Sequence, residues 1–287
     1  MVAILRSSAV LKALSGILTA EDLKEALTGV DVIGDIAIIK IPKSYEKKKH
    51  EIGECLLREF AGVRSVFSQN SPASAGDRVR GIEWLAGDDR SATIYSEHGC
   101  KFKVDVARVY FSPRLSFERH RIASLTKQGE IVVNMFAGVG TFSIIMAKTA
   151  GTAKVYSIDK NPDAYSLMLE NVAINKMDGR VIPLLGDAKD FGQKLAGIAD
   201  RVLMPLPELA IKYLPVALSF MKQKSHIHIY LHKRGNTKKD AIDVGIGELL
   251  AKFEGLMKIN KIEGRTVRSV GRRLYQLAVD IDLEKGA

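Results

Sequence analysis

Two glycines and two aspartates stand at the spacing of a nucleoside-binding site. Gly138 and Gly140 follow the short apolar run 131–135, where glycine lets the backbone turn tightly and approach a ligand closely. Asp159 lies 19 residues after Gly140, at the end of a second apolar run, where a carboxylate can accept both hydroxyls of a ribose. Asp187 lies a further 28 residues along, where it can accept a hydrogen bond from an adenine amine. The two carboxylates favour an adenosine-containing ligand over the alternative of an ordinary turn.

Position 143 distinguishes between two adenosine-containing cofactors. The fingerprint of dinucleotide sites has a third glycine three residues after the second, and Ser143 occupies that position here. A pyrophosphate site is therefore disfavoured. S-adenosylmethionine carries no phosphate and needs only a close approach of the backbone, so we expect S-adenosyl-L-methionine to be the cofactor.

Short apolar runs alternate with helical segments from about residue 130 onward. This alternation is typical of a parallel sheet with helices on both faces, which binds ligands at the carboxyl ends of its strands. The predicted fold class is therefore α/β. The predicted strands are 131–135, 154–158, 181–184, 201–204 and 226–230, the predicted helices are 142–148 and 162–175, and 257–263 with 275–282 is expected to form a terminal antiparallel hairpin.

The first 110 residues carry a different pattern, typical of a small α+β unit. A polar, arginine-rich stretch between Tyr110 and Glu130 marks the boundary between the two parts. The predicted elements of the first part are a short helix from Thr19 to near Gly29, a strand over 36–41, a helix over 45–60, and a hairpin of 92–97 and 101–107 that turns at His98-Gly99.

The charge balance indicates a polyanionic partner. Lys and Arg number 43 against 33 Asp and Glu, a formal net charge of +10, which favours nucleic acid first and an anionic membrane surface second. A basic protein that binds no polyanion is the alternative. No apolar run reaches the roughly 20 residues of a transmembrane helix. The two cysteines, Cys55 and Cys100, are too few for a four-cysteine zinc site, and His226, His228 and His232 have no accompanying ligand cluster, so we expect no metal.

One long segment and several short motifs resemble a known family. The segment is residues 104–121, Val-Asp-Val-Ala-Arg-Val-Tyr-Phe-Ser-Pro-Arg-Leu-Ser-Phe-Glu-Arg-His-Arg, and the short motifs are Asn134-Met-Phe-Ala-Gly-Val-Gly140, Asp159-Lys-Asn-Pro162, Glu170-Asn-Val-Ala-Ile-Asn175, Asp187, Met204-Pro-Leu-Pro207, Asp77-Arg-Val-Arg80 and Leu85-Ala-Gly-Asp-Asp-Arg90. Over roughly residues 34–282 they resemble the archaeal and eukaryotic class I methyltransferases that methylate N1 of guanosine 37 in tRNA. The resemblance implies a Rossmann-like class I methyltransferase sheet with a smaller N-terminal α+β domain.

A sister family transfers an aminocarboxypropyl group from the same cofactor during wybutosine synthesis. That family typically has Gly-Asn where this chain has the Pro-Arg-Leu of Ser112-Pro-Arg-Leu115. The segment therefore favours methyl transfer.

The resemblance also implies roles for individual residues. Glu118 would remove the proton from N1 of the guanine, and Arg78 would hold O6, where negative charge develops. Tyr110 would stack on or border the base, and Pro205 and Pro207 would shape its pocket. The residues implied to hold S-adenosylmethionine are Asn134, Phe136, Ala137, Gly138, Gly140, Asp159, Asn161, Asp187 and Arg119.

Structural alternatives exist for the residues assigned to the base. Glu118 can instead pair with Arg114, Arg119 or Arg121, since ion-pair networks also use such residues. Arg78 can equally be a solvated loop residue. Basic residues elsewhere that are candidates for tRNA phosphate contacts, or else solvated surface charges, are Lys43, Lys47, Lys48, Lys49, Lys233, Arg234, Lys238, Lys239, Arg265, Arg268, Arg272 and Arg273.

Three features depart from the family pattern. Asn134 stands where the family usually has aspartate, so a possible negative charge near the cofactor sulfonium is missing. Pro205-Leu-Pro207 replaces the usual Asn-Leu-Pro, which removes a side-chain amide and a backbone N–H beside the target base. Many members carry an additional N-terminal tRNA-reading domain, which we expect to be absent or reduced because about 33 residues precede the first matching segment.

The expected function is methylation of N1 of guanosine 37 in tRNA. The alternatives are methylation of the tricyclic wyosine precursor 4-demethylwyosine at the same position, alone or in addition, and a basic RNA-binding module with a vestigial cofactor site. We expect the partner to be the tRNA anticodon loop, with no membrane contact, a monomeric state and a cytoplasmic location. The expected domains are a helical extension (1–33), a small base-positioning α+β domain (34–112), a linker with the general base (113–129) and the S-adenosylmethionine-binding domain (130–287).

Overall fold

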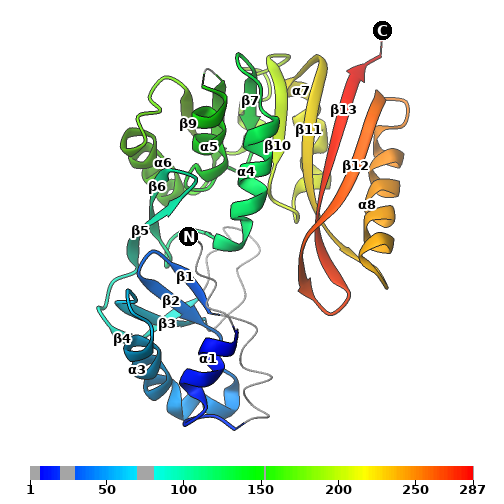
Figure 1. Ribbon diagram of the computed structural model, residues 1–287. Coiled ribbons are helices and arrows are strands. Elements are labelled where there is room, and N and C mark those ends of the chain that lie inside the picture. Colours follow the sequence, from blue (N-terminus) through cyan, green and yellow to red (C-terminus); the bar gives the residue numbers. More distant parts are fainter. Residues whose placement is uncertain (1–6, 20–29, 70–80, 152, 287) are drawn as a thin grey trace. The chain divides into compact units, whose positions relative to one another are not determined.

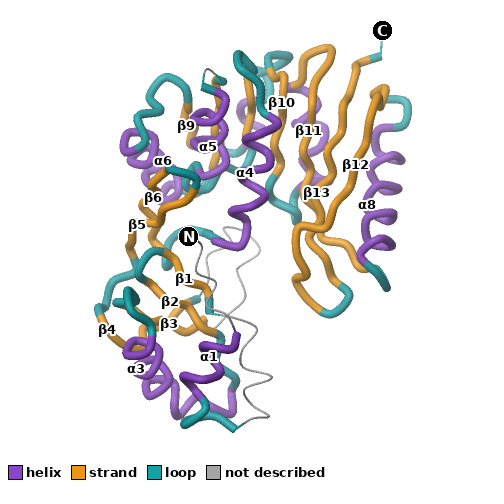
Figure 2. The backbone as a smooth tube through the Cα atoms, in the orientation of Figure 1, coloured by secondary structure: helices purple, strands orange, loops and turns teal. Residues whose placement is uncertain are grey.

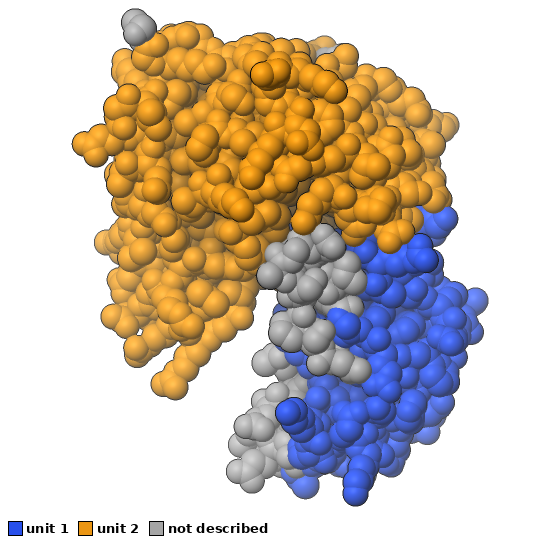
Figure 3. All heavy atoms as spheres, turned by 180° about the vertical axis from the view of Figure 1, so that it is seen from behind, with its two compact units in different colours: residues 1–117 blue, residues 118–287 orange. Residues whose placement is uncertain are grey.

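The computed structural model of the chain describes residues 7–19, 30–69, 81–151 and 153–286. Figures 1 and 2 trace the chain, and Figure 3 colours its two compact units, residues 1–117 and 118–287. None of the helices in these described ranges is long and apolar enough to cross a membrane. The short helix expected after Thr19 and the loop with Arg78 lie outside the described residues.

The first unit is built on a four-stranded sheet of order β1-β2-β3-β4. The neighbours β2 and β3 run parallel, and a helical segment connects them, whereas the two outer pairs are antiparallel. The predicted strand over 36–41 and the predicted helix over 45–60 are confirmed, although the helix begins as a 3₁₀ turn. The elements are α1 (Ser7–Leu14), β1 (Asp31–Ile33), β2 (Ile36–Ile39), the 3₁₀ helix η1 (Lys43–Lys48), α3 (Lys49–Glu59), β3 (Ser65–Gln69) and β4 (Ile82–Gly87).

The core of this sheet forms under α1 and α3. Ile52 and Leu56 recur at helical spacing on α3 and are fully buried. Val10 and Leu14 of α1 belong to the same apolar cluster. The N-terminal segment is therefore part of the packed unit.

A separate hairpin follows this sheet in the chain. It consists of β5 (Ala92–Glu97) and β6 (Cys100–Asp105), paired antiparallel. His98 and Gly99 form its two-residue turn with φ of 47° and 71°, the left-handed values that match the twist of a hairpin. The hairpin predicted across His98-Gly99 is confirmed. The 3₁₀ helix η2 (Pro113–Leu115) and the beginning of α4 (Ser116–Leu125) close the unit.

The second unit is a seven-stranded sheet of order β12-β13-β11-β10-β7-β8-β9. Strands β7 to β11 are parallel, and β13 runs antiparallel to β11 and β12 on either side of it. All five predicted strands and the terminal hairpin are confirmed. The elements are β7 (Ile131–Asn134), α5 (Thr141–Ala150), β8 (Lys154–Asp159), α6 (Pro162–Ile174), β9 (Val181–Leu185), the 3₁₀ helix η3 (Ala188–Phe191), β10 (Ala199–Met204), α7 (Ala210–Phe220), β11 (Met221–Arg234), α8 (Lys238–Phe253), β12 (Met257–Gly271) and β13 (Leu274–Lys285).

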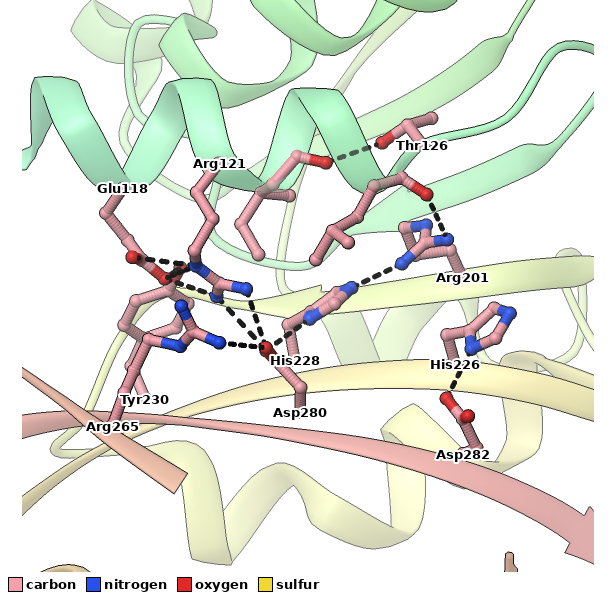
Figure 4. A network of polar contacts seen from close by, with 12 residues as sticks. Glu118, Arg121, Thr126, Arg201, His226, His228, Tyr230, Arg265, Asp280 and Asp282 are labelled. Carbon is pink, nitrogen blue, oxygen red and sulfur yellow. Dashed lines mark hydrogen bonds and ion pairs between the residues drawn. The ribbon is translucent and has the colours of Figure 1, made fainter. Parts of the chain in front are cut away.

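Helices cover both faces of the seven-stranded sheet, as expected. Strand alternation sends Ile227 and Ile229 of β11 into an apolar core with α7 and α8. It sends His228 and Tyr230 to the opposite face, where Phe142 of α5 packs edge-on against Tyr230 at 6.1 Å between ring centres. One face of the sheet is therefore apolar, while the other carries buried polar groups beneath α4 (Figure 4).

Candidate active site

The residues predicted to bind a nucleoside meet at one edge of the seven-stranded sheet. Asn134 ends β7, Asp159 ends β8, and Gly186-Asp187 follow β9, all at the carboxyl ends of neighbouring parallel strands. The strand order reverses between β7 and β10, and Pro205 directly follows β10. Open α/β sheets bind ligands at this kind of switch point.

The turn between β7 and α5 requires glycine. Gly138 and Gly140 have φ of 56° and 86°, values that side chains with a Cβ rarely adopt. A Cβ on Gly140 would also lie 2.9 Å from Cγ of Met168. The turn thus presents bare backbone at the switch point, which suits a ligand that approaches the main chain closely.

Asp159 anchors this turn to the end of β8. Its Oδ2 accepts a hydrogen bond from the N–H of Gly138 at 2.6 Å, and its Oδ1 accepts one from the N–H of Asn161 at 2.9 Å. Asn161 in turn caps α6 by accepting from the N–H of Asp163 at 2.9 Å. A carboxylate has about four acceptor positions, so Asp159 can hold the turn and a ribose together.

Asn134 joins the end of β7 to the first turn of α5. It is fully buried, its Nδ2 donates to Oγ of Ser143 at 3.0 Å, and its Oδ1 accepts from the N–H of Phe136 at 3.4 Å. An aspartate at this position has no N–H to donate and would require the hydroxyl of Ser143 to donate instead. Asn134 and Ser143, two departures from familiar patterns, are therefore partners of each other.

Asp187 is held by a residue that the sequence did not indicate. The hydroxyl of Tyr213 donates to its Oδ2 at 2.6 Å, and the N–H of Lys189 donates to its Oδ1 at 3.0 Å. Burial works to raise the pKa of Asp187, but these two donors lower it below its ordinary value, so the carboxylate is ionised at neutral pH. Burial and the neighbouring carboxylate raise the pKa of Tyr213 to about 12.

Aromatic and proline side chains flank the same edge. The ring of Phe136 packs edge-on against Tyr213 at 5.3 Å, while the N–H of Ala137 binds the carbonyl of Ile158 at 2.9 Å. Beyond β10, Pro205 is half-buried and Pro207 is buried. The predicted cofactor residues on β7, β8 and β9 and the predicted pocket prolines are therefore gathered at one sheet edge.

Glu118 and Arg119 lie on α4, and both are buried. Arg121, one turn along, donates through Nε to both carboxylate oxygens of Glu118 at 3.1 and 3.0 Å. The hydroxyl of Tyr230 donates to Oε1 at 2.8 Å. The ion pair with Arg121, one of the alternatives for Glu118, is therefore present, and Figure 4 shows the carboxylate turned towards β11.

Arg121 is shared with a second carboxylate, Asp280 of β13. Its two terminal nitrogens donate to the oxygens of Asp280 at 2.6 and 3.1 Å. Burial works to raise the pKa of Asp280, but hydrogen bonds from His228 and Arg121 hold it well below the ordinary value. Arg121 thus lies between the buried carboxylate of Glu118 and the half-buried carboxylate of Asp280.

His228 extends the network towards β10. A guanidinium only donates hydrogen bonds, so Nε2 of His228 accepts from Arg201, and Nδ1 carries the proton that it donates to Asp280 at 2.6 Å. Burial lowers the pKa of His228, which keeps the ring neutral. Arg201 is balanced by Glu130 at 2.8 Å and donates to the carbonyl of Leu125 on α4. In the described part of the chain, no group of three or more His, Cys, Asp or Glu side chains is arranged to hold a metal ion.

The first unit carries a basic groove of about 760 Å³ beside the hairpin. Arg64, Arg90 and Lys103 line it, together with Thr93 and a single carboxylate, Asp35. Arg90 binds Asp35 through two hydrogen bonds of 3.1 and 2.5 Å, which balances its charge. Arg64, Arg90 and Lys103 outnumber Asp35 in this lining, so the groove carries a net positive charge.

The other sequence candidates in and near the first unit have different surroundings. Tyr110 is half-buried after β6, and Arg114 pairs with Asp31 at 2.7 Å. Among the basic residues considered for phosphate contact, Lys49 pairs with Glu46 and Glu83 at 2.7 and 2.8 Å. That candidate is therefore a structural ion-pair partner in this fold.

The strand order, the glycine turn, Asp159 at the end of β8 and Asp187 after β9 define a class I methyltransferase of Rossmann-like fold. The family model of the TRM5/TYW2 methyltransferase domain matches residues 93–261 of this sequence, and the family model of the TYW2 N-terminal domain matches residues 10–90. The chain belongs to the TRM5/TYW2 methyltransferase family.

Two curated relatives cover most of the chain. The tRNA 4-demethylwyosine(37)-methyltransferase Taw21 of Saccharolobus solfataricus is 38% identical over 91% of this chain and 96% of its own length. The tRNA (guanine(37)-N(1))-methyltransferase Trm5b of Pyrococcus abyssi is 37% identical over 88% of this chain and 74% of its own length.

Solved structures agree in fold. The complex of aTrm5 with tRNALeu superposes with a TM-score of 0.83 at 34% identity, covering 97% of this chain and 79% of that one. Trm5 of Methanocaldococcus jannaschii in complex with adenosine gives a TM-score of 0.76 at 35% identity, covering 94% and 77%. The adenosine in that homologue accords with a nucleoside site at this sheet edge.

Replacing Asp159 with alanine should weaken S-adenosylmethionine binding far more than tRNA binding. The change removes an acceptor for ribose hydroxyls, worth about 1.5–3 kcal/mol for each charge-assisted hydrogen bond, and releases Gly138 from its anchor. Calorimetric titration of the cofactor measures the effect. Asp178→Ala, at an exposed turn before β9, is the matched control and should titrate like the wild type. Equal affinities in both variants would remove Asp159 from the cofactor site.

Proposed function

We propose that this protein transfers a methyl group from S-adenosylmethionine to N1 of guanosine 37 in tRNA. The observation that carries the proposal is the sheet edge where the glycine turn and Asp159 adjoin the Pro205-Leu-Pro207 loop. The relatives named as guanine-37 N1-methyltransferases support the substrate. The Pro-Arg-Leu of η2 supports methyl transfer over aminocarboxypropyl transfer.

The residues at the edge fit an adenosine-bearing cofactor. Asp159 would accept the ribose hydroxyls, Asp187 would accept from the adenine amine, and Phe136 would border the nucleoside. When bound, S-adenosylmethionine supplies a methyl group on a positively charged sulfur. Asn134 adds no charge there, so the carboxylates Asp159 and Asp187 are the anionic groups that these strand ends contribute.

Removal of the N1 proton is the step assigned to Glu118. N1 of guanine is a poor nucleophile while it carries its proton, so a positioned base is required. The carboxylate of Glu118 already accepts hydrogen bonds from Arg121 and Tyr230. Arg78 would hold O6 as charge develops, and Tyr110 would border the base.

A second substrate, the wyosine precursor 4-demethylwyosine, is favoured by two observations. The match to Taw21 extends over 91% of this chain. Pro205 removes the amide and the N–H that the usual asparagine would present to the base, so the loop selects its occupant by shape. The intact pairing of Asp159 with Gly138 argues against a vestigial cofactor site.

The partner proposed is the anticodon loop of tRNA around position 37. The tRNA complex of the homologous aTrm5 supports tRNA as the ligand. We further propose that the protein acts as a monomer and that it is cytoplasmic, where the buried thiols of Cys55 and Cys100 would stay reduced.

Nucleoside mass spectrometry tests the function directly. Unmodified tRNA with guanosine at position 37, incubated with the protein and S-adenosylmethionine, should yield 1-methylguanosine at that position. A parallel reaction with tRNA carrying 4-demethylwyosine tests the second substrate. Absence of a methylated nucleoside from both reactions would overturn the proposal.

Glu118→Gln should slow single-turnover methyl transfer by about two to four orders of magnitude, the usual contribution of a positioned base. Cofactor and tRNA affinities should change little, because the substitution is nearly isosteric. Glu254→Gln, at an exposed position after α8, is the control and should retain the wild-type rate. A rate for Glu118→Gln that equals the control at every pH would assign Glu118 to structural pairing alone.

Arg64→Ala with Lys103→Ala should weaken tRNA binding and reduce its dependence on salt. Each phosphate that the protein no longer neutralises takes roughly 0.7–0.9 off the slope of log affinity against log salt concentration. Arg58→Ala, exposed on α3 and outside the groove, is the control. Filter binding over a range of salt concentrations measures both slopes, and an unchanged slope in the double variant would exclude the groove as a tRNA-binding surface.

A further inference from the structure

We propose that Asp280 and Tyr230 are positioning residues that set the proton affinity of Glu118 from opposite directions. Asp280 raises the proton affinity of Glu118 because it shares the cation Arg121. Tyr230 lowers that proton affinity because its hydroxyl donates a hydrogen bond to the carboxylate. The inference rests on the proposed role of Glu118 as the base. It assigns a function to the buried polar face beneath α4, which the cofactor site does not use.

The geometry divides one guanidinium between two carboxylates. Arg121 donates to Glu118 through Nε at 3.0 Å and to Asp280 through Nη1 at 2.6 Å, while Nη2 lies between the two carboxylates and donates to both. The side chains of Glu118 and Arg121 are 4% and 11% exposed, so solvent screens these charges poorly. Each carboxylate therefore competes with the other for the same cation.

The balance of charge shows what this competition achieves. Glu118, Arg121 and Asp280 together carry one net negative charge, and His228 beside them is neutral. Arg265 contacts Asp280 only at 3.8 Å and is 41% exposed, so solvent screens its charge more than that of Arg121. When Glu118 takes a proton, the remaining pair of Arg121 with Asp280 is balanced. Without Asp280, the same protonation would leave the guanidinium buried and unpaired, which is strongly unfavourable. Asp280 therefore makes Glu118 a better proton acceptor.

Tyr230 lowers the proton affinity of Glu118, the opposite of the effect of Asp280. Its hydroxyl donates to Oε1 of Glu118 at 2.8 Å, and a hydrogen bond to the charged form of a carboxylate favours that form. Burial, reinforced by the charge of Glu118, raises the pKa of Tyr230 well above its ordinary value, so the hydroxyl keeps its proton and remains a donor. The ring is fixed by Phe142 of α5.

The groups around Glu118 come from four elements of the same unit. On α4 it faces Arg121, on β11 Tyr230, and on β13, through Arg121, Asp280. Behind Asp280 lie His228 of β11 and Arg265 of β12, the latter at 3.8 Å and 41% exposed (Figure 4). Arg201 beyond His228 is balanced by Glu130. Within this network, Asp280 is the carboxylate that shares the cation of Glu118.

The chain contains its own control for Asp280. Asp282 lies two residues along β13 on the same face of the sheet, and it pairs with His226 of β11 at 2.6 Å, as Asp280 pairs with His228. Within the described residues, no hydrogen bond or ion pair joins Asp282 to Arg121. Asp282→Asn therefore makes the same chemical change in an equivalent aspartate–histidine pair that does not contact Arg121.

Single-turnover methyl transfer as a function of pH tests the proposal. The rate should rise with pH as Glu118 becomes a carboxylate. In Asp280→Asn, Glu118 is the one remaining carboxylate that pairs with Arg121 in this network, so the acid limb should move to lower pH by about one unit. The plateau rate should fall as well, because the base is weaker. In Tyr230→Phe the carboxylate loses a donor, so the acid limb should move to higher pH.

The pH–rate profile of Asp282→Asn should superpose on that of the wild type after correction for the fraction of folded protein. A loss of stability alone would lower the amplitude of the profile without moving its acid limb. Asp280→Ser is the second variant at this position, and Tyr230→Phe carries the test if both Asp280 variants unfold. Unmoved acid limbs in the folded variants overturn the inference while the proposed function stands. A wild type that methylates no tRNA overturns both.

Discussion

The burial of charge beneath α4 is the constraint on which the second unit depends. A guanidinium or carboxylate removed from water needs a partner, and here several of the pairs join segments that lie far apart in the chain. Arg201 of β10 pairs with Glu130 and also holds the last turn of α4 through the carbonyl of Leu125. Arg121 ties the same helix to Asp280 of β13. The position of α4 on the sheet is therefore fixed by the ion pair of Arg121 with Asp280 in its middle and by the hydrogen bond that its last residue accepts from Arg201.

The cofactor edge meets a different requirement, which is access to bare backbone. Gly138 and Gly140 supply the turn, and Asp159 fixes it with a hydrogen bond to the N–H of Gly138 at 2.6 Å. Because β10 and β11 continue the sheet formed by β7, β8 and β9, the sheet that holds the cofactor loops also holds Tyr230, the partner of Glu118 on β11. One sheet thus relates the nucleoside site to the helix that carries the proposed base.

The local sequence pattern was sufficient to predict the strands of the second unit and the cofactor-binding strand ends, because apolar runs and turn glycines depend mainly on residues close to them in the chain. It was insufficient for Glu118, because its partner Tyr230 and the Asp280 that shares Arg121 with it are more than a hundred residues away along the chain. A signal did exist: His226 and His228 alternate with isoleucines on β11, and β13 shows the same alternation with aspartates. When polar and apolar residues alternate along a strand of a sheet that helices cover on both faces, one of the two buried faces is polar. The sequence patterns did not indicate β3, β4, α4, α7 or α8, whose ends are set by packing and caps.

The loop after β10 then bears on which base the site accepts. A pocket that hydrogen-bonds its substrate rejects analogues lacking the partner group, whereas a pocket that selects by shape discriminates less. Pro205 and Pro207 have no N–H to offer, so within that tripeptide only Leu206 retains a backbone donor. Polar contact with the base must come from elsewhere, and Arg78 is the residue proposed for O6. A loop with so few donors discriminates by shape, which is the physical basis for proposing that one site serves both guanosine and its tricyclic derivative.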